Sequence, residues 1–262
     1  AACRRARIVK LFDTHAHLLS DRFDEDRQAL IAALPGRGLT GVIEIGTDLE
    51  HSEKAVQLAA QEDYIHAAIG VHPHDAGEAP DDYLEALEEL ARHPKVVALG
   101  EIGLDYYYEF SPRDVQRKAF ERQLALAKRL DLPAIVHMRE ATQDTLELLR
   151  EHKGLRGVMH CFSGSAETAE ICVDMGLYVS FTGSVTFKNA RKVVEAAAAV
   201  PLSRLMAETD CPYLSPEPVR GRRNDPSNVR YVIEKLAAIK GVGFDAMCEA
   251  NINNAKGLFG IR

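Results

Sequence analysis

Two histidines separated by a single residue follow the first apolar run of the chain. His15 and His17 come just after Ile8–Phe12, whose composition predicts a strand. Because side chains alternate between the faces of a strand, both imidazoles are expected to point the same way. Imidazole suits zinc and other first-row metal ions, so the pair indicates part of a metal site. Taken alone, the two residues fit equally well as solvated polar groups at a strand end.

The same chemistry recurs where later apolar runs end. Six of the ten histidines stand at such ends, with several carboxylates. Beyond the first run, these residues are Glu44, His72, His74, Glu101, Asp105, His137, His160, Glu208 and Asp210. One catalytic zinc ion takes only about three protein ligands. We therefore expect two ions that share a carboxylate, about 3.5–4 Å apart. Glu101, across the ring from the first pair and near His137, is the predicted bridge.

Eight short apolar runs alternate with amphipathic stretches, which predicts parallel strands joined by helices. The expected strands are Ile8–Phe12, Gly41–Ile45, Ile65–Val71, Val96–Ile102, Pro133–His137, Gly157–His160, Leu177–Phe181 and Leu205–Glu208. Eight units in about 250 residues are typical of a closed (β/α)₈ TIM barrel, with its active site at the carboxyl ends of the strands. A doubly wound open sheet is the second possibility, but the first strand lacks the Gly-rich turn common there. We expect one domain over residues 1–262.

Composition narrows the class of protein. The chain has 262 residues, a formal net charge of −7 and five scattered cysteines without a Cys-x-x-Cys pair. This cysteine pattern favours a reducing, cytoplasmic location. No apolar run is long enough for a bilayer, and the basic start Ala1–Arg7 is not followed by the apolar core of a signal peptide. A nucleic-acid-binding protein of this acidity would need metal ions for most of the positive charge at its site.

Five motifs follow one another along the chain: Asp13-Thr-His-Ala-His17, Gly70-Val-His-Pro-His74, Gly100-Glu-Ile-Gly-Leu-Asp-Tyr106, His160-Cys-Phe-Ser-Gly164 and Glu208-Thr-Asp-Cys-Pro-Tyr-Leu214. Together they resemble the TatD family of metal-dependent deoxyribonucleases. The resemblance runs in order from Asp13 to Pro226. One departure is Asp225, where the family motif leads us to expect Glu. The first motif alone belongs to the wider amidohydrolase superfamily.

The resemblance implies a TIM barrel that cleaves DNA phosphodiesters, as an exonuclease, with two divalent ions (zinc, magnesium or manganese). It implies one ion on His15, His17 and Asp210, a second on His137 and His160, and Glu101 between them. Asp210 would also act as the general base toward the attacking water. No membrane partner and no organic cofactor are expected.

Residues that hold the substrate are harder to infer. Candidates for phosphate contacts are His72, His74, Arg139, Arg222, Arg223 and Asn224. The loop after the last barrel strand is a common phosphate site, which favours Arg222 and Asn224. A solvated surface loop is an equally good interpretation of these charged residues.

Other polar residues near these motifs have competing interpretations. Glu44 is either a partner that orients a histidine or a carboxylate near the ions. Asp13 is expected to bond within the rim. The run Tyr106-Tyr107-Tyr108 could stack on bases, although at least one ring is expected to pack on the barrel. Cys161 is expected on the face opposite His160 and therefore not as a nucleophile.

Two other functions stay open on the sequence. An amidohydrolase acting on a carbonyl or small phosphoester is the first. Many such enzymes bridge their metals with a modified lysine on the fourth strand, where this chain has Glu101, and Lys95 lies too early. A barrel that binds without catalysis is the second, and it predicts broken ligand positions, which the chain does not show.

Overall fold

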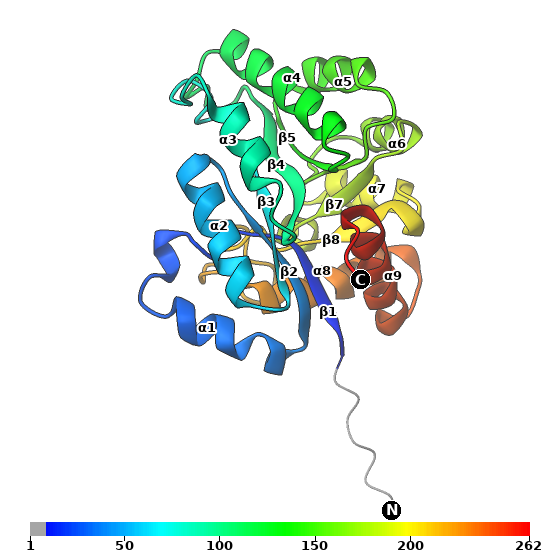
Figure 1. Ribbon diagram of the computed structural model, residues 1–262. Helices are drawn as coiled ribbons and strands as arrows, with labels where there is room; N and C mark the ends of the chain where they lie inside the picture. The colour runs from blue at the N-terminus through cyan, green and yellow to red at the C-terminus, as the bar shows by residue number, and fades with distance from the viewer. Residues whose placement is uncertain (1–8) are drawn as a thin grey trace, which may run out of the picture.

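The computed structural model describes residues 9–262, and eight parallel strands form its sheet in sequence order (Figure 1). The strands are β1 Leu11–Ala16, β2 Leu39–Ile45, β3 Ile65–Ile69, β4 Val96–Asp105, β5 Ala134–Arg139, β6 Gly157–Met159, β7 Tyr178–Phe181 and β8 Leu205–Ala207. The predicted (β/α)₈ barrel is confirmed. The first strand begins at Leu11 and continues to Ala16, beyond the expected end at Phe12, so His15 lies within it. The basic start Ala1–Arg7 and Ile8 lie outside the described residues.

The helices lie outside the strands, and each occupies a stretch that separates two predicted strands or follows the last one. They are α1 Arg27–Ala33, α2 Leu49–Gln61, α3 Tyr83–Leu90, α4 Arg113–Arg129, α5 Thr142–Glu151, α6 Ala166–Asp174, α7 Arg191–Ala199, α8 Val229–Lys240 and α9 Phe244–Phe259. Short 3-10 turns lie at Asp21–Phe23, Pro35–Arg37, Gly183–Thr186, Leu202–Arg204 and Pro226–Asn228. No helix of residues 9–262 is long and apolar enough to cross a membrane.

The seam between β8 and β1 closes the barrel with few backbone pairs. Ala16 and Cys211 form an isolated parallel bridge, and the Asp210 amide donates to the His15 carbonyl at 3.0 Å. Asn251 of α9 connects the two strands: its Oδ1 accepts from the Ala207 amide and its Nδ2 donates to the Phe12 carbonyl. A helix side chain thus supplies backbone partners that a short β8 lacks.

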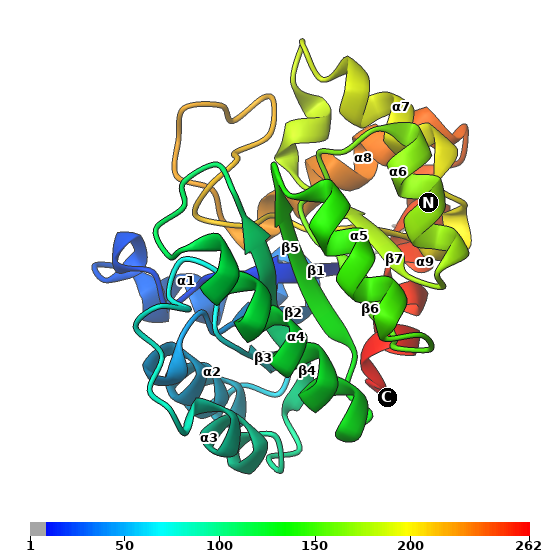
Figure 2. The same ribbon diagram turned by 90° about the horizontal axis from the view of Figure 1, so that it is seen from above.

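Apolar side chains fill one end of the barrel. Phe12, Ile43, Ile135 and Met206 from the strands form a buried cluster with Leu258 and other residues of α9. A larger apolar cluster joins the strands to the surrounding helices. Polar donors are therefore left at the opposite end, where the strands finish and the loops after β4 and β8 extend (Figure 2).

Candidate metal centre

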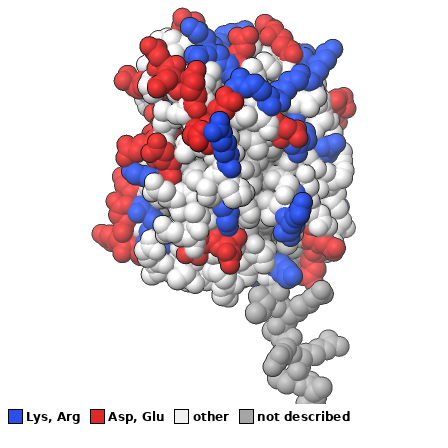
Figure 3. Space-filling view, in the orientation of Figure 1, with Lys and Arg blue, Asp and Glu red and all other residues white. Residues whose placement is uncertain are grey.

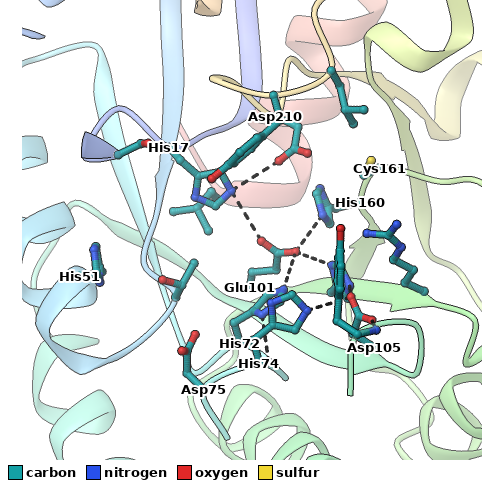
Figure 4. Close-up of a pocket in the computed structure, with 18 of the residues that line it drawn as sticks. His17, His51, His72, His74, Asp75, Glu101, Asp105, His160, Cys161 and Asp210 are labelled. Atoms are coloured by element: carbon teal, nitrogen blue, oxygen red, sulfur yellow. Dashed lines mark hydrogen bonds and ion pairs between the residues drawn. The ribbon is translucent and has the colours of Figure 1, made fainter. Parts of the chain in front are cut away.

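A pocket of about 1110 Å³ opens at the carboxyl ends of the strands. Predicted site residues from different strands line it together (Figure 4): His17, Glu44, His72, His74, Glu101, Asp105, His137, Arg139, His160 and Asp210. They come from the ends of seven strands or from the residues that follow those ends. Barrel closure brings these side chains to one place because parallel strands all end at the same rim.

One set of donors joins the first and last strands. The Nε2 atoms of His15 and His17 lie 3.2 Å apart. Asp210 Oδ1 lies 3.7 Å from His15 Nε2 and 3.4 Å from His17 Nε2. Glu101 Oε2 approaches His15 Nε2 at 3.3 Å. Nitrogen and oxygen atoms of four side chains therefore converge on one point at the rim.

The other carboxylate oxygen of Glu101 faces a second set of imidazoles. Its Oε1 lies 2.7 Å from His137 Nδ1, 2.9 Å from His160 Nε2 and 3.5 Å from His72 Nε2. Three groups have ligand atoms all within 4.8 Å of one another: His15, Glu101 and His160; His15, His17 and Asp210; and His72, Glu101 and His137. The structure thus groups His137 with His72, a residue expected only to touch substrate.

The electrostatics of Glu101 follow from this crowding. Burial alone would raise its pKa, but His160 and His72, with hydrogen bonds from His137 and His15, hold the pKa of Glu101 well below its usual range. Burial lowers the pKa of His72 to about 4, which favours the neutral imidazole that ligates metals. The buried Nδ1 of His15 has no hydrogen-bond partner among the described residues. Several imidazoles and carboxylates that converge in this way are a donor set suited to divalent metal ions.

Two further carboxylates hold these histidines from outside. Glu208 accepts from His160 Nδ1 at 3.1 Å and from Ser180 Oγ at 2.6 Å. Asp105 Oδ2 lies 3.0 Å from His74 Nε2 and 3.1 Å from His137 Nε2. A carboxylate on the second ring nitrogen fixes the orientation of a ligating imidazole. The sequence predicts that both carboxylates lie at strand ends. It does not predict which histidine each one contacts.

Glu44 and Asp13 act on the backbone next to the donors. Glu44 accepts from the amides of Leu18 and Leu19, immediately after His17, at 2.8 and 3.1 Å. Burial raises the pKa of Glu44 to about 7. Asp13 accepts hydrogen bonds from the backbone amide and the hydroxyl of Thr209, as expected for a residue of the rim. Both carboxylates therefore position the segments that carry His15, His17 and Asp210.

The predicted phosphate contacts divide into two groups. His72, His74 and Arg139 line the pocket. Asn224 is fully buried and donates to the carbonyls of Thr209 and Tyr213, so it shapes the loop after β8. Arg222 is exposed and is not among the residues that line the pocket. Arg223 pairs with Asp26 at 2.6 Å.

The expected position of Cys161 is wrong. Its side chain lines the pocket instead of turning to the opposite face. Strand β6 ends at Met159 and Cys161 has a φ of 46°, so strand alternation no longer applies. Burial, with the charge of Asp210, raises the pKa of the Cys161 thiol to about 12. A protonated thiol is a poor nucleophile, so that part of the expectation is consistent with the structure.

Fold and donor set together define a metal-dependent hydrolase of the barrel type. The family model described as TatD related DNase matches residues 12–260. The chain is 44% identical over 253 residues to the uncharacterized metal-dependent hydrolase YabD of Bacillus subtilis, covering 96% of this chain and 99% of that protein. It is 36% identical to the 3'-5' ssDNA/RNA exonuclease TatD of Pantoea ananatis, covering 96% and 100%.

A solved structure agrees with the sequence relatives. The TatD homolog YJJV from Escherichia coli K12 superposes with a TM-score of 0.91 at 32% identity, covering 98% of this chain and 100% of that one. The chain belongs to the TatD family of metal-dependent hydrolases, as its motifs predicted.

Proposed function

We propose that this protein is a nuclease that cleaves phosphodiester bonds of single-stranded DNA from one end, using two divalent ions. One observation carries the proposal: the two oxygens of the Glu101 carboxylate face different sets of donors, Oε2 toward His15 and Oε1 toward His137 and His160. A carboxylate shared in this way suits a dinuclear site. Relatives named as ssDNA/RNA exonucleases support the choice of substrate.

The residues divide between two ions. His15, His17 and Asp210 would hold one ion, His137 and His160 the other, and Glu101 both. His72 is close enough to Glu101 to join the second ion or its substrate. Divalent ions at such a site provide a nucleophile at neutral pH and offset the charge of the phosphate oxygens.

The chain's own groups complete the chemistry. Burial opposes ionisation of Asp210, but the hydrogen bond from His17 and the nearby His160 and His15 lower its pKa, so the carboxylate is ionised at neutral pH. We infer that Asp210 accepts the proton of the attacking water. We further infer that Arg139, which lines the pocket, binds a phosphate oxygen.

The test is hydrolysis of end-labelled single- and double-stranded DNA with EDTA, Mg²⁺, Mn²⁺ or Zn²⁺, resolved on a gel. We expect metal-dependent shortening of the single strand from one end. His15→Ala combined with His17→Ala should abolish it, whereas His152→Ala, at the far end of α5, should not. Full turnover by the double variant would refute the assignment.

A small phosphoester is the alternative substrate. Hydrolysis of bis-p-nitrophenyl phosphate without any cleavage of DNA would favour it. Loss of that hydrolysis in the His15→Ala, His17→Ala variant would still assign the chemistry to the same metal centre.

A further inference from the structure

Exposed aromatic rings gather at the mouth of the pocket. Five large hydrophobic side chains are exposed among the described residues, and four are aromatic: Tyr107 (59% exposed), Tyr108 (48%), Phe110 (70%) and Tyr213 (48%). Tyr108 and Tyr213 line the pocket itself. The fifth, Ile171, lies on α6 and does not line it. Exposed apolar surface concentrated beside a site indicates that a ligand covers it.

Three of these rings belong to the segment that joins β4 to α4, residues 106–112, here called the aromatic loop. Tyr108 and Phe110 are nearly parallel, with ring centroids 5.3 Å apart and an interplanar angle of 13°. His74 meets both rings edge-on, at 5.5 and 4.8 Å. Since His74 also bonds to Asp105, the aromatic surface is continuous with the donors around Glu101.

Side chains from neighbouring elements hold the aromatic loop in place. Asp105 Oδ1 accepts from the amides of Tyr107 and Tyr108 at 3.0 and 2.9 Å. Ser111 Oγ donates to the His74 carbonyl, and Gln116 Nε2 donates to the Ser111 carbonyl. The exposed rings are thus presented by an ordered loop, which reduces the entropic cost of binding a planar ligand.

Tyr106 differs from the other rings of this loop. Its hydroxyl donates to Asp144 at 2.6 Å and its ring packs against the core, which confirms that at least one tyrosine of the run supports the barrel. The remaining rings are therefore the ones available to a ligand.

The pocket offers little positive charge to a nucleic acid. Among the described residues that line it, Arg139 is the one Lys or Arg, and its guanidinium lies 4.1 Å from the Tyr107 ring centroid and 4.7 Å from that of Tyr108. Contacts to a strand must then come from surfaces other than a basic groove. Aromatic rings with an arginine on their faces bind unpaired bases by stacking, irrespective of sequence.

We propose that the aromatic loop is a platform on which an unpaired nucleobase stacks, with Tyr108 and Phe110 as the contact surface, while the adjoining phosphodiester lies over Glu101. This inference rests on the proposed nuclease function and adds the residues that contact an unstacked base beside the cleaved bond. Paired bases in a duplex are already stacked and cannot use the platform.

The test compares two single-stranded oligonucleotides that differ only near the cleaved end. One carries a base at each of the last three nucleotides, and the other carries tetrahydrofuran abasic residues there. The wild-type protein should have a higher kcat/KM for the first, by about fivefold to a hundredfold, the range for stacking on aromatic side chains. Phe110→Ala with Tyr108→Ala should remove this preference by slowing cleavage of the base-containing oligonucleotide only.

Matched variants separate stacking from folding. Phe110→Tyr keeps an aromatic face and should retain the preference. Ile171→Ala removes an exposed hydrophobic group away from the pocket and should change neither rate. Equal loss on both oligonucleotides in the Phe110→Ala, Tyr108→Ala variant would overturn the proposal, because a misfolded loop, not a lost base contact, would explain it.

A second measurement does not depend on cleavage. The fluorescence of a single strand that contains 2-aminopurine should decrease when the strand binds the wild-type protein, in EDTA or with metal. The decrease should be smaller when the strand binds the Phe110→Ala, Tyr108→Ala variant. If wild type cuts neither oligonucleotide, the nuclease proposal fails and this quenching alone decides on the platform. Cleavage of both at equal rates, with equal quenching by wild type and variant, would refute the platform and leave the nuclease standing.

Discussion

Glu101 illustrates at the residue scale how a buried carboxylate stays ionised. It is 3% exposed, yet the imidazoles of His15, His72, His137 and His160 all approach its two oxygens. An ion pair of this kind is costly to bury unless every lone pair is used. The four imidazoles offset the cost of burying the Glu101 carboxylate, and this is why it stays ionised.

Asp210→Asn separates proton transfer from binding. The variant keeps the shape of the side chain but cannot accept a proton, so we expect kcat on single-stranded DNA to fall by about 10²–10⁴-fold. The Kd for the strand should change much less. Kinetics and a binding titration with the same oligonucleotide measure both. Asp75→Asn, at another carboxylate that lines the pocket, is the control; equal losses of kcat and affinity in Asp210→Asn would contradict its role as base.

At the element scale, the site depends on how closely β4 and β5 approach each other. Gly103 pairs with His137 and has a φ of 148°. A Cβ at position 103 would press into the His137 carbonyl oxygen, inside van der Waals contact. Glycine is required here both by the backbone conformation and by the space.

Gly103→Ala should therefore lower the free energy of unfolding by about 2–5 kcal/mol, the sum of backbone strain and overpacking. It should also reduce activity, since His137 moves. Gly154→Ala is the matched control: its φ of 82° is also unfavourable to alanine, but nothing lies within 4 Å of a new Cβ. We expect a cost of about 1–2 kcal/mol there. Equal denaturation midpoints for the two variants would show that the contact with β5 does not matter.

The seam at β1 and β8 depends on one helix side chain. Asn251→Ala leaves the Ala207 amide and the Phe12 carbonyl buried without partners. We expect the free energy of unfolding to fall by about 2–5 kcal/mol, measured by urea denaturation. Asn253, exposed on the same helix, provides the control, because its change to alanine should cost less than about 0.5 kcal/mol. A small effect of Asn251→Ala would mean that the seam holds without it.

For the whole molecule, charge determines how a polyanion is bound. The chain carries a net charge of −7, and Lys and Arg are interspersed with Asp and Glu on the face seen in Figure 3. Binding that releases counterions from many phosphates would require a concentrated basic surface. The pocket instead combines metal donors, aromatic rings and Arg139.

We therefore predict a weak dependence of cleavage on salt. For single strands the slope of log affinity against log salt is about −0.7 per neutralised phosphate. With Arg139 as the main contact from the chain, log kcat/KM should fall with a slope shallower than about −1.5 at saturating metal. Arg139→Gln should make that slope shallower by about 0.7. A slope steeper than about −3 would reveal a basic contact surface outside the pocket.

Sequence alone determined the eight strands, the amphipathic stretches between them and the donor residues at most of the strand ends. These features are local: periodicity reports which face of an element is buried, and a donor after an apolar run is placed at a strand end by its position in the chain. The order of the motifs along the chain also identifies the family. Even Asp13 could be assigned to the rim, and at least one tyrosine of the run 106–108 to the barrel, whereas the structure showed that this tyrosine is Tyr106.

Tertiary structure decided the contacts between strands. It placed Glu208 behind His160, Asp105 behind His137, and His72 beside Glu101. It buried Asn224 within a loop and turned Cys161 into the pocket. Each outcome joins residues far apart in the chain, or depends on a loop that no longer follows strand alternation. The physical reason is that a ring of eight strands fixes such distances only when it closes, and periodicity carries no information about closure.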